Sequence, residues 1–390
     1  MKFTKSSSVF NLSILCLAMI VCLASCKNDA VDPTPNMNES VASDTWISEL
    51  KSVIDDTDYY YTLSLDENDE NIALSNHRIL KVDADGQIVS NIDFTPAAED
   101  RVFTKIYKGK IYRFVDPNDF SNFDPNKNIS LEIYDTSGAL LSTHSLDADG
   151  LLYDVQIEDT EHIGMMVFNR DNFTMKVQKF HIDNGMLAEH VLSTSSSQPN
   201  RLFISEQGNY YCYHSGAAKT YFHFDNDLNL NVQNNFSSFF IRGIQPVPGR
   251  GMFAMGSKSG ASMDFSFSNV SFAYIGEDGE LNNRVDLEID DSKRVYDFQI
   301  NDEVLCIILG EPETNLGFQL RFFDLDFTPL STLDIPGFGP TSNVILNDNG
   351  SFTFLYGFLP DPASTNFAES VPRIFKLDKT YTIPTTIIEQ

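Results

Sequence analysis

Apolar and polar residues alternate in short runs along most of this chain, and one arrangement of them recurs. A strand-like run is followed by a turn rich in Asp and Gly and then by a second strand-like run, as in "LKVDADGQIV" from Leu80 and "LEIYDTSGALL" from Leu131. Strict alternation predicts half-buried β-strands. An Asp side chain can bond to its own backbone and Gly accepts a positive φ, so each turn predicts a hairpin. Further copies begin at Val177, Thr220, Ser271, Leu320 and Arg373.

The copies are evenly spaced. They repeat after about 49 residues, which is the period of a supersecondary unit rather than of a single hairpin. The turn positions that align are Asp83, Asp135, Ile182, Asp225, Gly276, Asp324 and Asp378. The third unit is expected to hold four strands, at Leu151–Glu158, Ile163–Asn169, Met175–Ile182 and Met186–Leu192. Only residues 45–54 suggest a helix.

Four-stranded units at this period resemble the blades of a β-propeller, and the resemblance covers residues 45–390. It implies an all-β fold, a seven-bladed β-propeller of four-stranded blades. A β-solenoid has much shorter rungs, and two packed sandwiches would not keep one period. The pattern starts with an innermost strand and ends with an outermost one containing Pro384, unless residues 46–54 join the last unit. No specific propeller family is identified, because the WD, kelch and sialidase Asp-box signatures are absent and Trp46 is the single Trp.

The N-terminal segment has the organisation of a secretory leader. Lys2 and Lys5 precede an apolar stretch, residues 12–23, that is short for a membrane span, and Leu23-Ala24-Ser25-Cys26 follows. This sequence resembles the bacterial lipobox, which implies cleavage before Cys26 and attachment of fatty-acyl chains such as palmitate to it. We therefore expect a signal peptide over residues 1–25, a flexible tether over 26–43, poor in large apolar residues, and the propeller domain over 44–390.

In many Gram-negative lipoproteins the residue after the lipidated cysteine is an aspartate that keeps the protein from reaching the outer membrane. Here that residue is Lys27. The resemblance therefore implies a lipid-anchored protein of the outer membrane. Whether the chain faces the periplasm or the cell surface is left open.

Charge and cysteine content narrow the function classes. The formal net charge is −28, and nucleic-acid binding requires a basic surface, so nucleic acid is excluded as a partner. Beyond the leader and Cys26, Cys212 and Cys306 remain, each inside an apolar run. We expect two buried thiols there, with a disulfide as the alternative.

No catalytic motif stands out. The seven His are scattered, and no serine elbow, phosphate loop or dinucleotide motif occurs. The oxygen-rich loop "DPNDFSNFDPN" is the one weak candidate for a metal, with Asp116, Asp119 and Asp124 as calcium ligands, and a solvated polar loop is the alternative. No other cofactor is expected.

Long connections identify a candidate working face. The longest insertions fall between the second and third strands of their units, a slot that opens on one face of a propeller, and loops on a rigid scaffold carry function. They expose Phe120, Phe123, Phe265 and Phe367 among Asn, Asp and Ser, which suits sugars or extended polypeptides. The insertions are residues 66–71, 116–128, 257–268, 311–316 and 359–370.

Four arginines point to the same face. Arg101, Arg201, Arg242 and Arg294 lie at the beginning of the first strand of their units. That strand lines the axis of a propeller, so we expect the four guanidinium groups near one mouth of the channel. There they could bind a carboxylate or sulfate. The alternative is local pairing with acids such as Asp100 and Asp290.

These features favour a non-catalytic binding or assembly module of the cell envelope that recognises a glycan or a partner protein with one propeller face. The alternative is a glycan-processing enzyme, a hydrolase or lyase, acting at the channel mouth.

The lipobox predicts that Cys26→Ser abolishes lipid attachment, because the serine hydroxyl does not replace the thiol as the acylated group. Metabolic labelling with a fatty acid and membrane fractionation measure the change. The variant should be unlabelled and released or mis-sorted. Equal membrane association of both forms, with no label on the wild type, would contradict the lipid anchor.

Overall fold

The structure is a computed structural model. It describes residues 46–49, 60–65, 71–75, 78–83, 85–94, 101–118, 123–124, 127–170, 173–192, 199–214, 220–247, 249–258, 269–289, 293–301, 303–310, 316–338, 340–346, 351–358 and 371–378. All of these belong to one compact unit, Asp44–Gln390. Within the described part, no helix is long and apolar enough to cross a membrane.

The described strands form seven four-stranded antiparallel sheets, numbered here in chain order. Sheet one holds β2 (Tyr60–Leu65), β3 (Asn71–Ser75), β4 (Arg78–Val82) and β5 (Ile88–Asp93). Sheet two holds β6 (Arg101–Tyr107), β7 (Lys110–Asp116), β8 (Ile129–Asp135) and β9 (Leu140–Leu146). Sheet three holds β10 (Leu151–Ile157), β11 (His162–Asn169), β12 (Thr174–His181) and β13 (Gly185–Val191). Sheet four holds β14 (Pro199–Ile204), β15 (Tyr210–His214), β16 (Thr220–Phe224) and β17 (Leu230–Asn235).

The last three sheets follow the same order. Sheet five holds β18 (Phe239–Val247), β19 (Gly251–Lys258), β20 (Asn269–Ile275) and β21 (Leu281–Glu288). Sheet six holds β22 (Arg294–Ile300), β23 (Val304–Gly310), β24 (Leu316–Asp324) and β25 (Pro329–Phe338). Sheet seven holds β26 (Pro340–Leu346), β27 (Phe352–Phe358), β28 (Val371–Leu377) and β1 (Trp46–Glu49).

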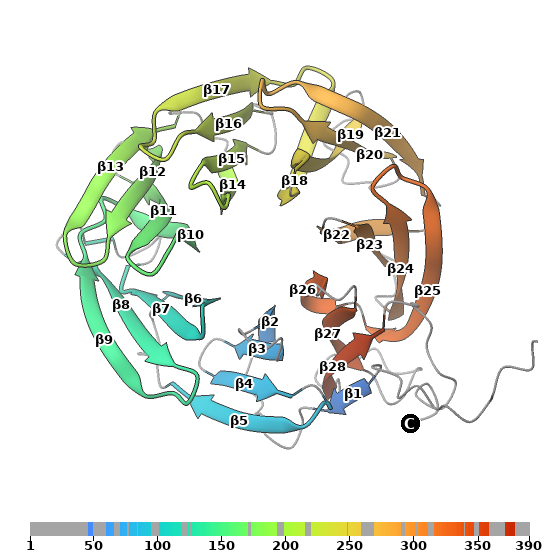
Figure 1. The fold of residues 1–390 in the computed structure, drawn as a ribbon, viewed down its shortest axis with the longest axis horizontal. Coiled ribbons are helices and arrows are strands. Elements are labelled where there is room, and N and C mark those ends of the chain that lie inside the picture. Colours follow the sequence, from blue (N-terminus) through green and yellow to red (C-terminus); the bar gives the residue numbers. More distant parts are fainter. Residues whose placement is uncertain are drawn as a thin grey trace, which may run out of the picture. The chain divides into compact units, whose positions relative to one another are not determined.

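The sheets stand around a common centre. The first strand of each sheet is innermost, and each first strand contacts the first strand of the next sheet, from β2 and β6 round to β22 and β26 (Figure 1). The ring closes because β26 also contacts β2. The expectation of an all-β propeller built from four-stranded blades is therefore confirmed. In sheet three the predicted strands agree with β10–β13 to within a residue or two at each end.

Sheet seven corrects one expectation. Its outermost strand is β1, which pairs antiparallel with β28 from Trp46↔Lys376 to Glu49↔Arg373. The prediction that a strand after Asp378 would be outermost is wrong, and the stated alternative, in which residues 46–54 join the last unit, is confirmed for β1. Pro384 lies outside the described residues. The suggestion of a helix is also wrong for the strand residues of β1. Hydrogen bonding to β28 decides the conformation of these residues, and local periodicity does not report such a distant partner.

The repeated turns join the third and fourth strands and use the predicted chemistry. Asp Oδ1 accepts the backbone N–H groups two and four residues later at 2.8–3.0 Å, at Asp83, Asp135, Asp225 and Asp324. The third residue after the Asp has positive φ, as at Gly86 (81°) and Gly138 (86°). The register shifts beside several of these turns, as between Ile133 and Tyr134, which is the hairpin in which a turn is followed by a bulge.

The hydrophobic core lies between neighbouring sheets. Between sheets five and six, the Phe253 ring centroid lies 5.4 Å from that of Phe272 and 5.2 Å from that of Phe298, and all three residues are buried. Cys212 and Cys306 are free and buried in such layers, which confirms the expectation of buried thiols. Burial raises the pKa of the Cys212 thiol, so it stays protonated and acts as a small apolar group.

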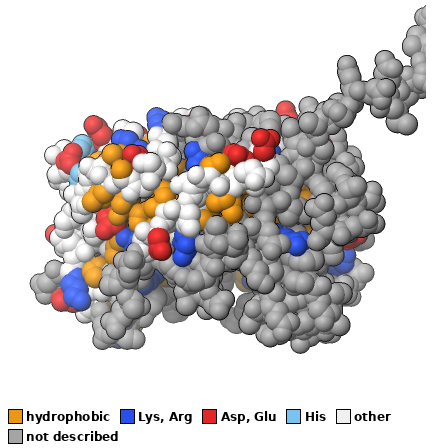
Figure 2. All heavy atoms as spheres, turned by 90° about the horizontal axis from the view of Figure 1, so that it is seen from below, with side chains coloured by type: hydrophobic (Ala, Val, Ile, Leu, Met, Phe, Trp, Pro, Cys, Tyr) orange, Lys and Arg blue, Asp and Glu red, His pale blue; other side chains and the backbone are white. Residues whose placement is uncertain are grey.

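The outermost strands present a mixed surface to solvent. Their residues alternate between exposed and half-buried, and they follow the hairpin turns directly. Figure 2 views this side surface and shows hydrophobic side chains among charged and polar ones. Exposed apolar residues near the beginning of these strands are Val89, Leu140, Leu141, Met186, Leu187, Leu230 and Leu330.

The turn geometry predicts that Asp135→Ala lowers the melting temperature. The Ser137 hydroxyl and the Ala139 N–H hold the pKa of Asp135 below its ordinary value. The stabilisation is therefore present above the unfolded-chain pKa of about 3.9 and is lost as the pH falls through the lower folded value. Melting followed by circular dichroism should show a difference at neutral pH that shrinks below about pH 4. The control is Asp85→Ala, an exposed acid in the middle of another turn. An Asp135→Ala difference that does not change with pH would contradict the carboxylate's role.

Candidate functional site

The strand order defines two faces of the ring. We call loop face the one where each first strand begins, and turn face the opposite one. Antiparallel order places the connections between second and third strands on the loop face, as predicted for residues 116–128, 257–268, 311–316 and 359–370. The placement of residues 66–71 was wrong, because this segment connects β2 to β3, the first and second strands of sheet one. Spacing alone could not assign the first strand of that sheet.

The predicted aromatic residues lie mostly outside the described part. Phe120, Phe265 and Phe367 are not described. Phe123 is half-buried, beside a loop held by Asn118, whose Oδ1 accepts the Asp124 N–H at 2.9 Å. An exposed aromatic surface on the loop face therefore stays a prediction.

The first strands share a bulge that sequence analysis did not find. Pairing between first and second strands skips one residue at Tyr61, Tyr153, Arg242 and Tyr296. In β14 it skips residues 200–201, and in β26 it skips residues 341–343. The described pairing of β6 with β7 is unbroken. A bulge turns a side chain away from the normal alternation and occurs often beside binding sites.

Arg201 and Arg242 occupy this bulge in two neighbouring sheets. Arg201 is exposed and Arg242 is half-buried, and burial lowers the pKa of Arg242. In sheet three the corresponding residue is Tyr153, which is half-buried, and in sheet six it is Tyr296, which is 49% exposed. The innermost strands thus carry two guanidinium groups flanked by tyrosine rings.

The carboxylate of Asp297 belongs to the same set of innermost strands. Asp297 follows the bulged Tyr296 in β22, and its Oδ1 accepts the Phe298 N–H at 2.9 Å. Burial raises the pKa of Asp297, while the positive charge of Arg201 acts to lower it. Arg201 belongs to sheet four and Asp297 to sheet six. This electrostatic interaction therefore joins two sheets that are not neighbours in the ring, since sheet five lies between them. Asp297 is half-buried, and an acid whose pKa is shifted by both burial and a specific cation is a candidate for a functional site.

The four predicted arginines do not form one group of equivalent positions. Arg101 begins β6, and its guanidinium lies 4.0 Å from the Asp116 carboxylate and over the Phe103 ring. The expected local pairing thus occurs, with Asp116 instead of Asp100. Arg294 begins β22, and its side chain is not described. Arg201 and Arg242 lie inside their strands, at the bulge.

The candidate calcium loop gives Asp116 another role. Asp116 is fully buried, its Oδ1 accepts the Asn118 N–H at 3.0 Å, and its Oδ2 accepts the Leu152 N–H at 2.8 Å. Asp119 lies outside the described residues, and Asp124 is half-buried. No cluster of three metal-ligating side chains occurs within the described part of the chain. Asp116 connects sheet two to sheet three, and calcium binding by this loop stays an untested expectation.

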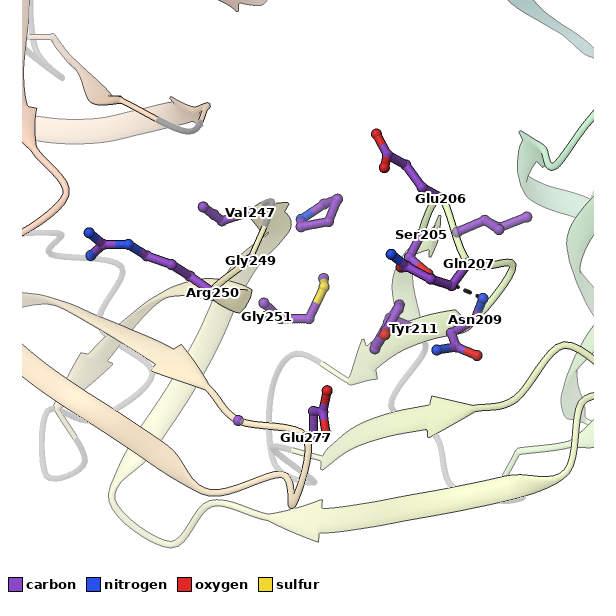
Figure 3. A pocket seen from close by; sticks show the side chains of 14 residues that line it. Ser205, Glu206, Gln207, Asn209, Tyr211, Val247, Gly249, Arg250, Gly251 and Glu277 are labelled. Atoms are coloured by element: carbon purple, nitrogen blue, oxygen red, sulfur yellow. Dashed lines mark hydrogen bonds between the residues drawn. The ribbon is translucent and has the colours of Figure 1, made fainter.

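The turn face carries a cavity that sequence analysis missed. Its volume is about 670 Å³, and it lies between sheets four and five (Figure 3). Three short turns and the strand ends beside them line it. In the sequence, long insertions were selected as candidate functional loops, so these short turns were not selected. The lining residues are Ile204, Ser205, Glu206, Gln207, Asn209, Tyr211, Pro246, Val247, Gly249, Arg250, Gly251, Met252, Gly276 and Glu277.

A second polar cluster on the turn face joins sheets three and four. Lys179 Nζ donates to Glu158 Oε1 at 2.9 Å, and Tyr210 OH donates to Glu158 Oε2 at 2.6 Å. Asn226 Nδ2 also donates to Glu158 Oε1, at 2.8 Å. Burial and the Glu158 carboxylate raise the pKa of Tyr210, which keeps its hydroxyl a donor. Because its charges and donors satisfy one another, this cluster is structural.

The contacts of Asp116 predict that Asp116→Ala lowers the free energy of unfolding by about 2–4 kcal/mol, because two N–H groups lose their acceptor. Urea denaturation measures this change. Asp147→Ala, an exposed acid in the next loop-face connection, should change it by less than about 0.5 kcal/mol. If calcium instead raises the wild-type midpoint over that in a chelator, and Asp116→Ala abolishes the rise, the loop is a calcium site.

Comparison with known proteins identifies the fold. No family model matches the chain, and no curated protein sequence matches it. It is similar to the WD40 domain of Neurospora crassa Pan2, with a TM-score of 0.54 and 10% identity, covering 87% of this chain and 97% of that one. It is also similar to a europium-containing methanol dehydrogenase (TM-score 0.49, 9% identity, 81% of each chain) and to the WD40 domain of SCAP from fission yeast (0.44, 8%, 82% and 85%). At these identities the likeness to the Pan2 domain shows the fold alone, an all-β propeller with four-stranded blades.

Proposed function

We propose that this protein is a lipid-anchored, non-catalytic binding module of the outer membrane. It holds a glycan or a partner protein at the loop face of its propeller. The observation that carries the proposal is the shared bulge of the first strands, which holds Arg201 and Arg242 in neighbouring sheets; the positive charge of Arg201 also acts to lower the pKa of Asp297.

The chemistry of this arrangement favours an anionic or strongly polar ligand. A guanidinium can donate two parallel hydrogen bonds to a carboxylate or sulfate. An anionic ligand bound to Arg201 would offset the positive charge that acts on Asp297. Burial raises the pKa of Asp297 and thus already disfavours its charged form, so losing Arg201 to a ligand is less costly than breaking a strong ion pair.

The tyrosine positions add a contact of another kind. Tyr296 is 49% exposed at the equivalent bulge, and Tyr153 is half-buried there. An aromatic ring offers an apolar face to a sugar or an extended peptide and a hydroxyl to its polar groups. The combination of rings and guanidinium groups supports an acidic glycan or an acidic segment of a protein as the ligand.

The location rests on the N-terminal motif. The lipobox-like sequence ending in Cys26 and the polar residues 27–43 support a lipid anchor joined to the propeller by a tether. Lys27 supports the outer membrane, since a retention aspartate is absent from that position.

Arg201→Ala should weaken binding to an acidic glycan by about 1.5–3 kcal/mol, the range for a hydrogen bond to a charged group. A glycan array identifies an acidic oligosaccharide that binds the full chain carrying Cys26→Ser. Titration calorimetry with that oligosaccharide then compares the variants.

Lys127→Ala is the matched control, because it removes one exposed positive charge from the loop face away from the bulges. It should leave the affinity within about two-fold. Equal losses for Arg201→Ala and Lys127→Ala would contradict the site. Turnover of any oligosaccharide by the wild type would contradict the non-catalytic function and favour a hydrolase or lyase.

A further inference from the structure

The cavity between sheets four and five has an acidic rim. Glu206 lies in the turn that joins β14 to β15, and Glu277 lies in the turn that joins β20 to β21, and both are exposed. Figure 3 shows them on opposite sides of the cavity, with Tyr211 between them. A positive group inside the cavity would thus have a carboxylate on each side.

Arg250 is the positively charged residue in the cavity lining, and its guanidinium contacts sheet six. Arg250 Nη1 donates to the Leu325 carbonyl at 3.3 Å and to Asp326 Oδ1 at 3.4 Å, and the guanidinium lies over the Tyr274 ring. In Figure 3 its side chain points away from Tyr211 and Glu277. Its charge is directed to sheet six and is shared with Asp326, so the lining has an excess of negative charge.

The floor of the cavity is apolar and fixed. Tyr211 stacks on His223 with the ring centroids 4.6 Å apart and the planes within 12°. Met252 and Val247, which are both buried, also line the cavity. Burial lowers the pKa of His223, so the ring that supports Tyr211 is neutral at neutral pH and does not repel a cation bound above it.

Amide groups complete the lining. Gln207 is exposed, and Asn209 is half-buried with its N–H donating to Ser205 Oγ at 3.2 Å. Side-chain amides both donate and accept, as the peptide backbone requires of a partner. A volume of about 670 Å³ is within the range of pockets that bind a drug-sized ligand, so it has room for one basic side chain and the backbone next to it.

We propose that this cavity binds a basic segment of a partner polypeptide. A lysine or arginine side chain lies along Tyr211 and Met252 and brings its charge between Glu206 and Glu277, while Gln207 and Asn209 bond to the segment's backbone. Long basic side chains have an apolar stem and a charged end, which matches an apolar floor below an acidic rim. The site is on the turn face, so it is independent of the ligand proposed for the loop face.

Methyl NMR tests the proposal on the full chain carrying Cys26→Ser, with ¹³C-methyl methionine and the Met252 signal assigned from Met252→Leu. The probe is a blocked Gly-Lys-Gly-Lys-Gly peptide. Two comparison peptides replace lysine by norleucine, which keeps the stem without the charge, or by glutamate. The lysine peptide should shift the Met252 signal saturably, and the other two should bind at least about ten-fold more weakly.

Glu206→Gln with Glu277→Gln should weaken binding of the lysine peptide by about three- to twenty-fold, the sum of two exposed charge interactions. Raising salt from about 0.05 to about 0.5 M should weaken wild-type binding in the same direction. The matched control is Glu161→Gln with Glu303→Gln, which changes two glutamates of the turn face, in the turns between the first and second strands of sheets three and six. Unchanged melting temperatures verify that both double variants are folded.

Three results would overturn the proposal. The norleucine peptide binds as tightly as the lysine peptide, the control pair weakens binding as much as the cavity pair, or the lysine peptide leaves the Met252 signal unshifted up to about 10 mM, a concentration beyond the range of weak specific binding.

Discussion

The fold depends on the closure of the ring, in which strands from the two ends of the described chain meet. A four-stranded antiparallel sheet has two edges, and a ring of such sheets is stable only if the first and last sheets meet. Here β26 contacts β2 at the centre, and β1 completes sheet seven by pairing with β28. Without β1 the third strand of that sheet would be an open edge. The positions of the other first strands, and thus of every bulge near the centre, follow from this closure.

Carboxylates of the inner strands, buried at Asp116 and half-buried at Asp154, fix neighbouring sheets to one another. Asp116 at the end of β7 accepts the Leu152 N–H of β10, and Asp154 of β10 accepts the Leu202 N–H of β14 at 2.8 Å. Each acid thus satisfies a backbone donor of the next sheet, where the bulge interrupts regular pairing. This explains why acids near the centre of such an acidic chain need not be ligands. Asp116 and Asp297 differ in this respect. Both oxygens of Asp116 accept a backbone N–H, which gives this acid a structural role. Asp297 interacts electrostatically with Arg201, which supports a site.

Local chemistry made most of the fold predictable. The turn at Asp135 needs only a carboxylate, a nearby glycine and two alternating strands, all contiguous in sequence, so its repetition predicted the four-stranded blades. The conformation of β1 depends on β28, and no local pattern reports that. The bulge at Arg201 depends on the register of β14 with β15, and the bulge at Arg242 on that of β18 with β19, so both arginines lie inside their strands instead of at the predicted strand beginnings. The cavity depends on how three turns of two sheets meet, and each turn alone looks like an ordinary connection.

The bulges also bear on how such a protein could change its specificity. A bulged residue is left out of the ladder of pairs, so its side chain departs from the regular alternation of its strand. Exchange of Arg242 or Tyr296 therefore damages the core less than exchange of the neighbouring Ile241 or Val295, which are buried, whereas Tyr153 packs against the core. At these bulge positions of the first strands, residues can vary in evolution without changing the residues that form the core. One scaffold could then acquire many recognition patterns by substitution at a few places.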